Sequence, residues 1–114
     1  MNSMISAIIT KALDGLSLRS AATAQNIANA NSANYQPLSV SFEDELKAAS
    51  DQGEEAVHLL PIEMREASPT AGAQGIRMDM ELETQSETAL RYGALVDVLA
   101  RELSIQQAIV KGGQ

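Results

Sequence analysis

The sequence predicts a mainly all-α protein whose two long terminal helices form an antiparallel, coiled-coil-like pair. Near both ends of the chain, apolar residues recur at steps of three and four, which is the spacing of one face of an α-helix. Turn-forming residues collect between these two stretches. Only 3% of the residues are aromatic, so the composition favours long helices that bury small side chains over a large compact core.

These patterns divide the 114 residues into three segments, a length that suits one domain. Residues 1–34 are predicted to hold the N-terminal helix and its end. Residues 35–75 are predicted to form an extended or irregular middle segment with short strands. Residues 76–114 are predicted to form the C-terminal helix.

The N-terminal helix is predicted from a stripe of large apolar residues that continues into small ones. Asp14 and Gly15 interrupt the stripe, and glycine inside a helix costs about 1 kcal/mol relative to alanine. We therefore expect a helix that is firm only when it is packed. An ordinary amphipathic core helix would give the same pattern. The stripe consists of Ile9, Leu13, Leu16 and Ile27.

An asparagine-rich run from residue 24 to residue 35 is predicted to end this helix. Asparagine competes for backbone hydrogen bonds inside helices and tolerates the left-handed conformation where helices stop. Asn34 is therefore expected to adopt a positive φ angle. Asn26 and Asn29 share a helix face, so their amides are expected to bond the last free carbonyl groups or the backbone of a neighbouring subunit.

The middle segment begins as extended chain because Pro37 disfavours helix at the preceding residue. Serines alternate with apolar residues after it, which is typical of a short strand. Phe42 and Leu46 then indicate the start of a short helix, with Ser41 as its N-cap. Residues 48–75 contain glycines and prolines and are predicted to be a loop. Short extended pieces are expected within it at Val57, Leu59, Ile62 and Met64.

The C-terminal helix is predicted to start at Asp79, or at the capping box formed by Thr84 and Glu87. Gly112 and the glycine after it are predicted to end the helix. Between these limits an apolar stripe repeats at helical spacing. The stripe consists of Tyr92, Val96, Leu99 and Leu103, widened by Leu95 and Ile109.

Charge and composition exclude several classes of function. The net charge of −7 argues against binding to nucleic acid or to an anionic membrane surface. There is no cysteine, and His58 is the only histidine, so we expect no catalytic residue, no metal site, no cofactor and no enzymatic activity. No apolar run is long enough to insert into a membrane, and the N-terminal residues lack the pattern of a cleaved secretory signal.

The asparagine-rich run also resembles a known signature. Bacterial flagellar rod and hook proteins carry Asn-Ile-Ala-Asn, two variable residues, and then Thr-Pro-Gly-Tyr near their N-terminus. The corresponding run here reads Asn-Ile-Ala-Asn-Ala-Asn-Ser-Ala-Asn-Tyr, so Ser-Ala-Asn replaces Thr-Pro-Gly. The matching residues are Asn26, Ile27, Ala28, Asn29 and Tyr35, with Asn34 at the glycine position.

The C-terminal third is similar to the same family. There, a helix opens with alternating aliphatic and acidic residues, then a basic residue and tyrosine, and continues as a heptad stripe. Gln74 and Arg77 stand where the family has asparagine and valine. The matching residues are Ile76, Met78, Asp79, Glu81, Leu90, Arg91, Tyr92, Leu99 and Ile109.

The resemblance implies a structural subunit of the flagellar basal-body rod, in its proximal part. Such a subunit assembles with copies of itself and with other rod proteins in the periplasm. The rod links the membrane ring to the hook and transmits torque for motility. The flagellar type III export apparatus would export the chain without a cleaved signal peptide. Phe42 and Leu46 would form an export element, although they are equally well explained as local hydrophobic anchors.

A second class of function fits the same helices. A small helical-hairpin binding protein, such as a secretion chaperone or a regulator, would use the apolar stripes on one partner. A chaperone is expected to be well folded alone or as a dimer, whereas a rod subunit is expected to be partly unfolded alone and to self-associate.

Overall fold

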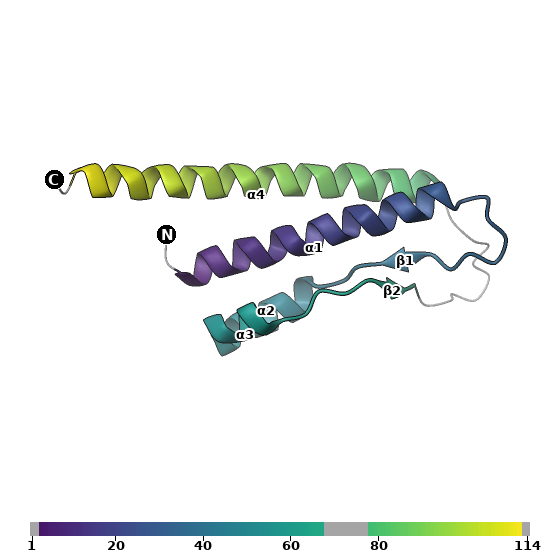
Figure 1. Ribbon diagram of the computed structural model, residues 1–114, viewed down its shortest axis with the longest axis horizontal. Coiled ribbons are helices and arrows are strands. Elements are labelled where there is room, and N and C mark those ends of the chain that lie inside the picture. The colour runs from purple at the N-terminus through teal and green to yellow at the C-terminus, as the bar shows by residue number, and fades with distance from the viewer. Residues whose placement is uncertain (1–2, 68–77, 113–114) are drawn as a thin grey trace.

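The computed structural model describes residues 3–67 and 78–112, and these residues form an elongated molecule of 63 × 27 × 15 Å. Helix α1 (Ser3–Ala28) lies between two other layers (Figure 1). Helix α4 (Met78–Gly112) runs antiparallel along one side of α1. The third layer holds strand β1 (Leu38–Ser39), helix α2 (Glu43–Gln52), helix α3 (Glu54–Leu59) and strand β2 (Arg65–Glu66). The predicted fold class is therefore confirmed: two long antiparallel terminal helices are joined by a middle segment with short strands.

Helix α1 runs without a break through Asp14 and Gly15, the two residues that interrupt its apolar stripe. Gly15 is buried, and a Cβ atom added there would lie 2.5 Å from Cε1 of Phe42. The glycine is thus needed for the close approach of the Phe42 ring. The helical cost of Gly15 is offset by this contact, which a single-sequence reading of propensity cannot register.

The middle segment contains more helix than the sequence predicts. Helix α2 starts after Phe42 and has no side-chain cap, so the predicted cap at Ser41 is wrong. The chain turns at Gly53, where φ is 125°, and continues directly into α3. Val57 and Leu59 are therefore helical, and the loop predicted to begin at residue 48 is wrong up to residue 59.

From residue 60 to residue 67, the described part of the middle segment contains no helix. Ile62 and Met64 lie outside helices and strands, and the residues just after them form β2. Strand β2 pairs antiparallel with β1, placing Leu38 opposite Glu66. The predicted alternation after Pro37 is confirmed, because Val40 and Phe42 are buried and the serines between the apolar residues are exposed.

The hydrophobic core lies mainly between α1 and the third layer. Leu95 of α4 packs against it as a partly buried residue. The core is small because alanines supply several of its members. Its buried members are Ala7, Leu16, Ala22, Val40, Phe42, Leu46, Ala49 and Val57.

Helix α4 spans Met78–Gly112 of the described residues, within the predicted range 76–114. Asp79 lies in its first described turn and the Thr84–Glu87 pair lies inside the helix, so neither is the N-cap that the sequence predicts. Gly112 is also helical, and the predicted stop after it lies outside the described residues, as do Gln74, Ile76 and Arg77.

Candidate functional site

The predicted signature folds around the amide of Asn26, which is 1% exposed. Its Oδ1 accepts hydrogen bonds from the backbone N–H of Leu38 at 2.8 Å and from the hydroxyl of Tyr35 at 3.2 Å. Its Nδ2 donates to the carbonyl of Leu38 at 2.8 Å and to Glu81 at 3.2 Å. One side chain near the end of α1 thus holds β1, the turn and the start of α4 together. We call these four interactions the Asn26 clamp.

The other signature residues shape the turn that brings β1 to this clamp. Asn34 has a φ angle of 61°, which confirms the predicted left-handed conformation. The Asn29 amide donates to the carbonyl of Gln25 at 2.9 Å, and its Oδ1 accepts from Ser32. Ile27 is half-buried and Ala28 is exposed. The Gln25 carbonyl also accepts the backbone N–H of Asn29 at 3.0 Å, so the Asn29 amide adds a second hydrogen bond to it and does not satisfy a free carbonyl. Asn26 bonds the backbone of its own chain beyond the turn.

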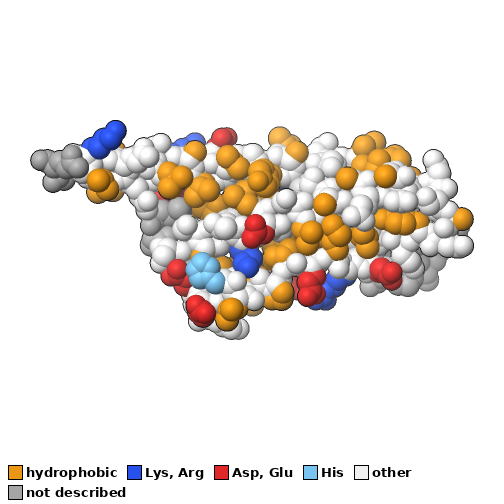
Figure 2. Space-filling model, in the orientation of Figure 1, with side chains coloured by type: hydrophobic (Ala, Val, Ile, Leu, Met, Phe, Trp, Pro, Cys, Tyr) orange, Lys and Arg blue, Asp and Glu red, His pale blue; other side chains and the backbone are white. Residues whose placement is uncertain are grey.

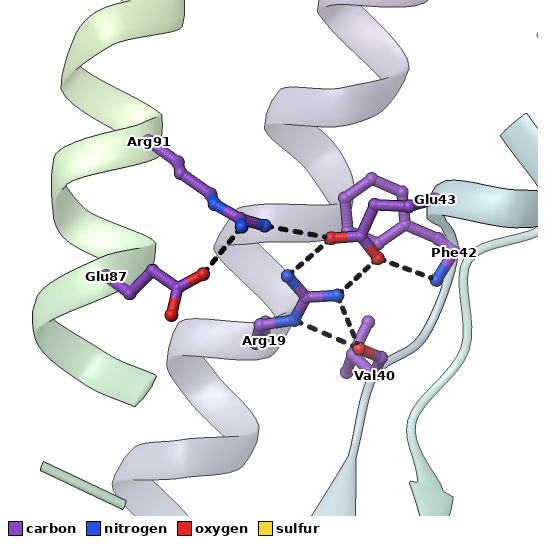
Figure 3. Close-up of polar contacts among 6 residues, drawn as sticks. All are labelled: Arg19, Val40, Phe42, Glu43, Glu87 and Arg91. Carbon is purple, nitrogen blue, oxygen red and sulfur yellow. Dashed lines mark hydrogen bonds and ion pairs between the residues drawn. The ribbon is translucent and has the colours of Figure 1, made fainter. Parts of the chain in front are cut away.

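A second polar cluster ties three helices together (Figure 3). Both terminal nitrogens of Arg19 donate to the carboxylate of Glu43 at 2.7 Å, and Nε and Nη2 donate to the carbonyl of Val40. The guanidinium also lies 5.0 Å from the centroid of the Phe42 ring, within cation–π range. Arg91 of α4 contacts Glu43 at 3.4 Å. The cluster therefore joins α1, the start of α2 and α4.

The cluster changes the acidity of Glu43. Hydrogen bonds from Arg19 lower the pKa of this carboxyl from 4.5 to about 2, against a smaller opposing effect of burial. Glu43 is therefore ionised throughout the neutral range. Glu87, one turn before Arg91 on α4, pairs with Arg91 at 2.6 Å.

The candidate export element lies inside the fold. Phe42 is 3% exposed and Leu46 is 7% exposed, and both belong to the core. The structure therefore places them as hydrophobic anchors of the third layer. Any partner that reads these two side chains needs them to leave the core first.

The predicted packing stripes divide into buried and exposed members. On α1, Ile9 and Leu16 are buried, whereas Leu13 is half-buried like Ile27. On α4, Leu95 and Leu99 are half-buried. The remaining α4 members are exposed in the single chain: Tyr92, Val96, Leu103 and Ile109.

The exposed members lie on α4 because its side toward α1 is largely polar. Thr88 is buried there, and Glu81, Thr84 and Gln85 are half-buried. Large apolar side chains occupy the flanks instead, and hydrophobic patches are visible along α4 in Figure 2. The exposed flank residues include Met80, Leu82, Leu90, Val98, Ile105 and Val110. We call this surface the outer face of α4.

The sequence analysis did not predict two sets of interactions, those of Arg19 and those of Lys11. Arg19 finds its partners more than twenty positions away, and no local spacing indicates such a pair. Lys11 donates to the carbonyls of His58 and Leu60, at the C-terminal end of α3, where a cation suits the helix dipole. Both residues lie on α1, so each ties the central helix to the third layer.

The described residues contain no cluster of three or more histidine, cysteine or acidic side chains that could hold a metal ion. His58 is exposed on α3 and pairs with Glu54 at 3.3 Å. Among the described helices, none is long and apolar enough to cross a membrane.

Comparison with known proteins adds no relative, because no protein-family model matches the chain and no curated protein matches it significantly.

Proposed function

We propose that this chain is a structural subunit of the flagellar basal-body rod, which self-assembles with other rod proteins. The observation that carries the proposal is the outer face of α4, where large apolar side chains are exposed along the helix. Surfaces of this extent on a small protein mark interaction sites. An α4 that packs on its own chain through a polar side leaves its apolar flanks for other helices.

The folded signature supports the same proposal. Rod proteins share an asparagine-rich helix end, and here that end forms the Asn26 clamp. The substitution of Asn34 for the family glycine keeps the left-handed turn, since φ is 61°. The departures from the family pattern therefore leave its backbone shape available.

Within the family, the Leu-Arg-Tyr sequence at Leu90–Tyr92 most resembles the proximal rod protein FlgB. The neighbouring proximal rod protein FlgC is the closest alternative. In either case the subunit would reach the periplasm through the flagellar type III export apparatus, and it would help transmit torque from the membrane ring to the hook.

The test is genetic and structural. The gene for this chain is deleted in its own bacterium, and the strain is complemented with the natural chain or with a tagged one. We expect the deletion strain not to swim, complementation to restore swimming, and the tagged chain to be found in the rod density of isolated basal bodies.

A deletion strain that swims normally would contradict the proposal. A tagged chain recovered in the cytoplasm on a single partner, and absent from basal bodies, would favour the alternative of a small secretion chaperone or regulator.

A further inference from the structure

One row of the outer face of α4 repeats every seventh residue without a break. All five members are apolar and exposed, with Leu82 at 53% and Leu103 at 48%. The positions that flank the row carry no charge, both at 86, 93, 100 and 107, which are exposed, and at 85, 92, 99 and 106, which lie nearer α1. The row consists of Leu82, Ala89, Val96, Leu103 and Val110, and we call it the heptad row.

A strict seven-residue repeat has a specific structural meaning. It keeps a seam facing a partner helix as the two helices wind around each other in a left-handed supercoil. The partner must therefore be a helix of comparable length with a free face. Within the described chain, α1 is covered by α4 on one side and by the third layer on another, whereas α4 has 35 residues and an open row.

We propose that α4 binds α4 of a second copy of this chain along the heptad row. The contact is isologous, so each copy contributes the same surface around a two-fold axis. It rests on the geometry of α4 and does not depend on the flagellar proposal.

Charge favours an antiparallel arrangement of the two helices. The first third of α4 carries Asp79, Glu81, Glu83 and Glu87 and no basic residue, whereas its last third carries Arg101, Glu102 and Lys111. A parallel pair would place the two acidic ends side by side. An antiparallel pair places each acidic end beside the weakly basic end of the other helix, and it also opposes the two helix dipoles.

Side-chain size then selects the register. With Val96 on the two-fold axis, each small residue of one helix faces a large residue of the other. Ala89 faces Leu103, Gly93 faces Leu99, and Ala100 faces Tyr92 of the second copy. Alternation of large and small residues is what lets two helices interlock closely.

Gly93 supports this register independently. It lies inside a long exposed helix, where glycine costs about 1 kcal/mol relative to alanine. A Cβ atom added there would meet nothing within 4 Å in the single chain, so no contact inside the chain requires a glycine. In the proposed pair, Gly93 gives Leu99 of the second copy room to approach.

The opposite flank of α4 lacks this continuity. It also carries exposed apolar residues, such as Val98 and Ile105. However, Glu87, Arg91 and Arg101 interrupt it, and Arg91 is engaged with Glu43. The opposite flank therefore provides a matched control for the heptad row.

The first test compares Val96→Glu with Val98→Glu in the full chain. Both valines are 40% exposed on the same helix, so the two changes should alter the stability of the single chain by similar amounts. Light scattering after size exclusion should give the mass of two 12.1-kDa chains for the natural protein at tens of micromolar. Val96→Glu should raise the Kd of the pair at least about a hundredfold by burying two like charges, whereas Val98→Glu should change it less than about threefold.

A single-chain mass for the natural protein at these concentrations would overturn the proposal, and so would equal dissociation by both variants. Circular dichroism of each variant checks that the helices persist.

The second test uses engineered cysteines, which report cleanly because the natural chain has none. Disulfides form only where the two Cα atoms lie within about 7 Å. A mixture of Ala89→Cys and Leu103→Cys chains should oxidise to mixed pairs, whereas Ala89→Cys alone should give few covalent pairs. Efficient pairing of Ala89→Cys with itself would indicate parallel helices and would overturn the proposed orientation.

Discussion

Asn26 and Asn34 perform different tasks in one helix end. Asn26 acts through its amide, which offers a donor and an acceptor to the two backbone groups of Leu38 and so imitates a neighbouring strand. Asn34 acts through its backbone, because asparagine is among the few residues that adopt a positive φ at low cost. Substitutions at the two positions should therefore follow different rules, one of hydrogen bonding and one of conformation.

The conformational rule predicts opposite results for two changes at Asn34. Asn34→Gly should leave the free energy of unfolding within about 0.5 kcal/mol, since glycine accepts positive φ readily. Asn34→Val should lower it by about 1–2 kcal/mol, because a β-branched residue resists this region. Urea unfolding measures both, and an unchanged midpoint for Asn34→Val would show that the turn has another conformation.

Gly15 and Gly93 provide a second pair of contrasting residues. Alanine favours a helix over glycine by about 1 kcal/mol, so Gly93→Ala should stabilise the single chain by about that amount. Gly15→Ala should destabilise it by about 1–2 kcal/mol net, because the new methyl group would lie 2.5 Å from the Phe42 ring. Thermal unfolding of dilute protein compares them, and stabilisation by both changes would mean that Phe42 moves aside freely.

At the scale of elements, the Arg19 cluster sets how α2 and α4 are attached to α1. Glu43 has its pKa lowered to about 2, so the folded chain binds that proton less readily than the unfolded chain does. Its contribution to stability is therefore complete above about pH 4.5 and is lost as the pH falls toward 2. Because the side chain is 47% exposed, solvent screening keeps this contribution modest.

This dependence can be measured with Glu43→Gln. Between pH 5 and pH 2, the variant should lose less stability than the natural chain, and at neutral pH it should be the less stable of the two. Glu45→Gln, on the exposed side of the same helix, is the control and should follow the natural chain. Parallel acid curves for the natural chain and Glu43→Gln would show that the cluster does not contribute.

The elements differ in how far the sequence predicted them. The two long helices followed from apolar spacing, and the left-handed turn followed from the properties of asparagine. Helix α3 has only 6 residues, too few for a helical period to differ from the alternation of Val57 and Leu59. The Arg19 cluster and the Asn26 clamp involve partners brought together by folding, so only the structure reveals them. The close approach of the Phe42 ring to Gly15 also arises only on folding, so the sequence alone shows Gly15 as a weakness of α1.

At the scale of the whole molecule, the three layers are held together unequally. The core lies between α1 and the third layer, and α4 adds the partly buried Leu95 to it. Most of the α4 side that faces α1 is polar. The layers should therefore separate in order, with α4 leaving before α1 and the third layer come apart.

Native-state hydrogen exchange tests this order. Amides of α4 in dilute single chains should exchange faster than those in the middle of α1, because α4 buries less apolar surface. The contrast should shrink in concentrated protein if α4 pairs with a second copy. Equal protection of α1 and α4 at low concentration would mean that the molecule unfolds as one cooperative unit.

The positions of the two tyrosines allow intrinsic fluorescence to report on two separate parts of this molecule. There is no tryptophan, so Tyr35 and Tyr92 dominate the ultraviolet emission. The hydroxyl of Tyr35 donates a hydrogen bond to Oδ1 of Asn26, whereas Tyr92 is 41% exposed on α4. Replacing either one with phenylalanine leaves a chain with a single tyrosine. The chain that keeps Tyr35 reports whether the end of α1 is folded. The chain that keeps Tyr92 reports whether the outer face of α4 is exposed to solvent or covered by a partner, and neither chain needs an attached dye.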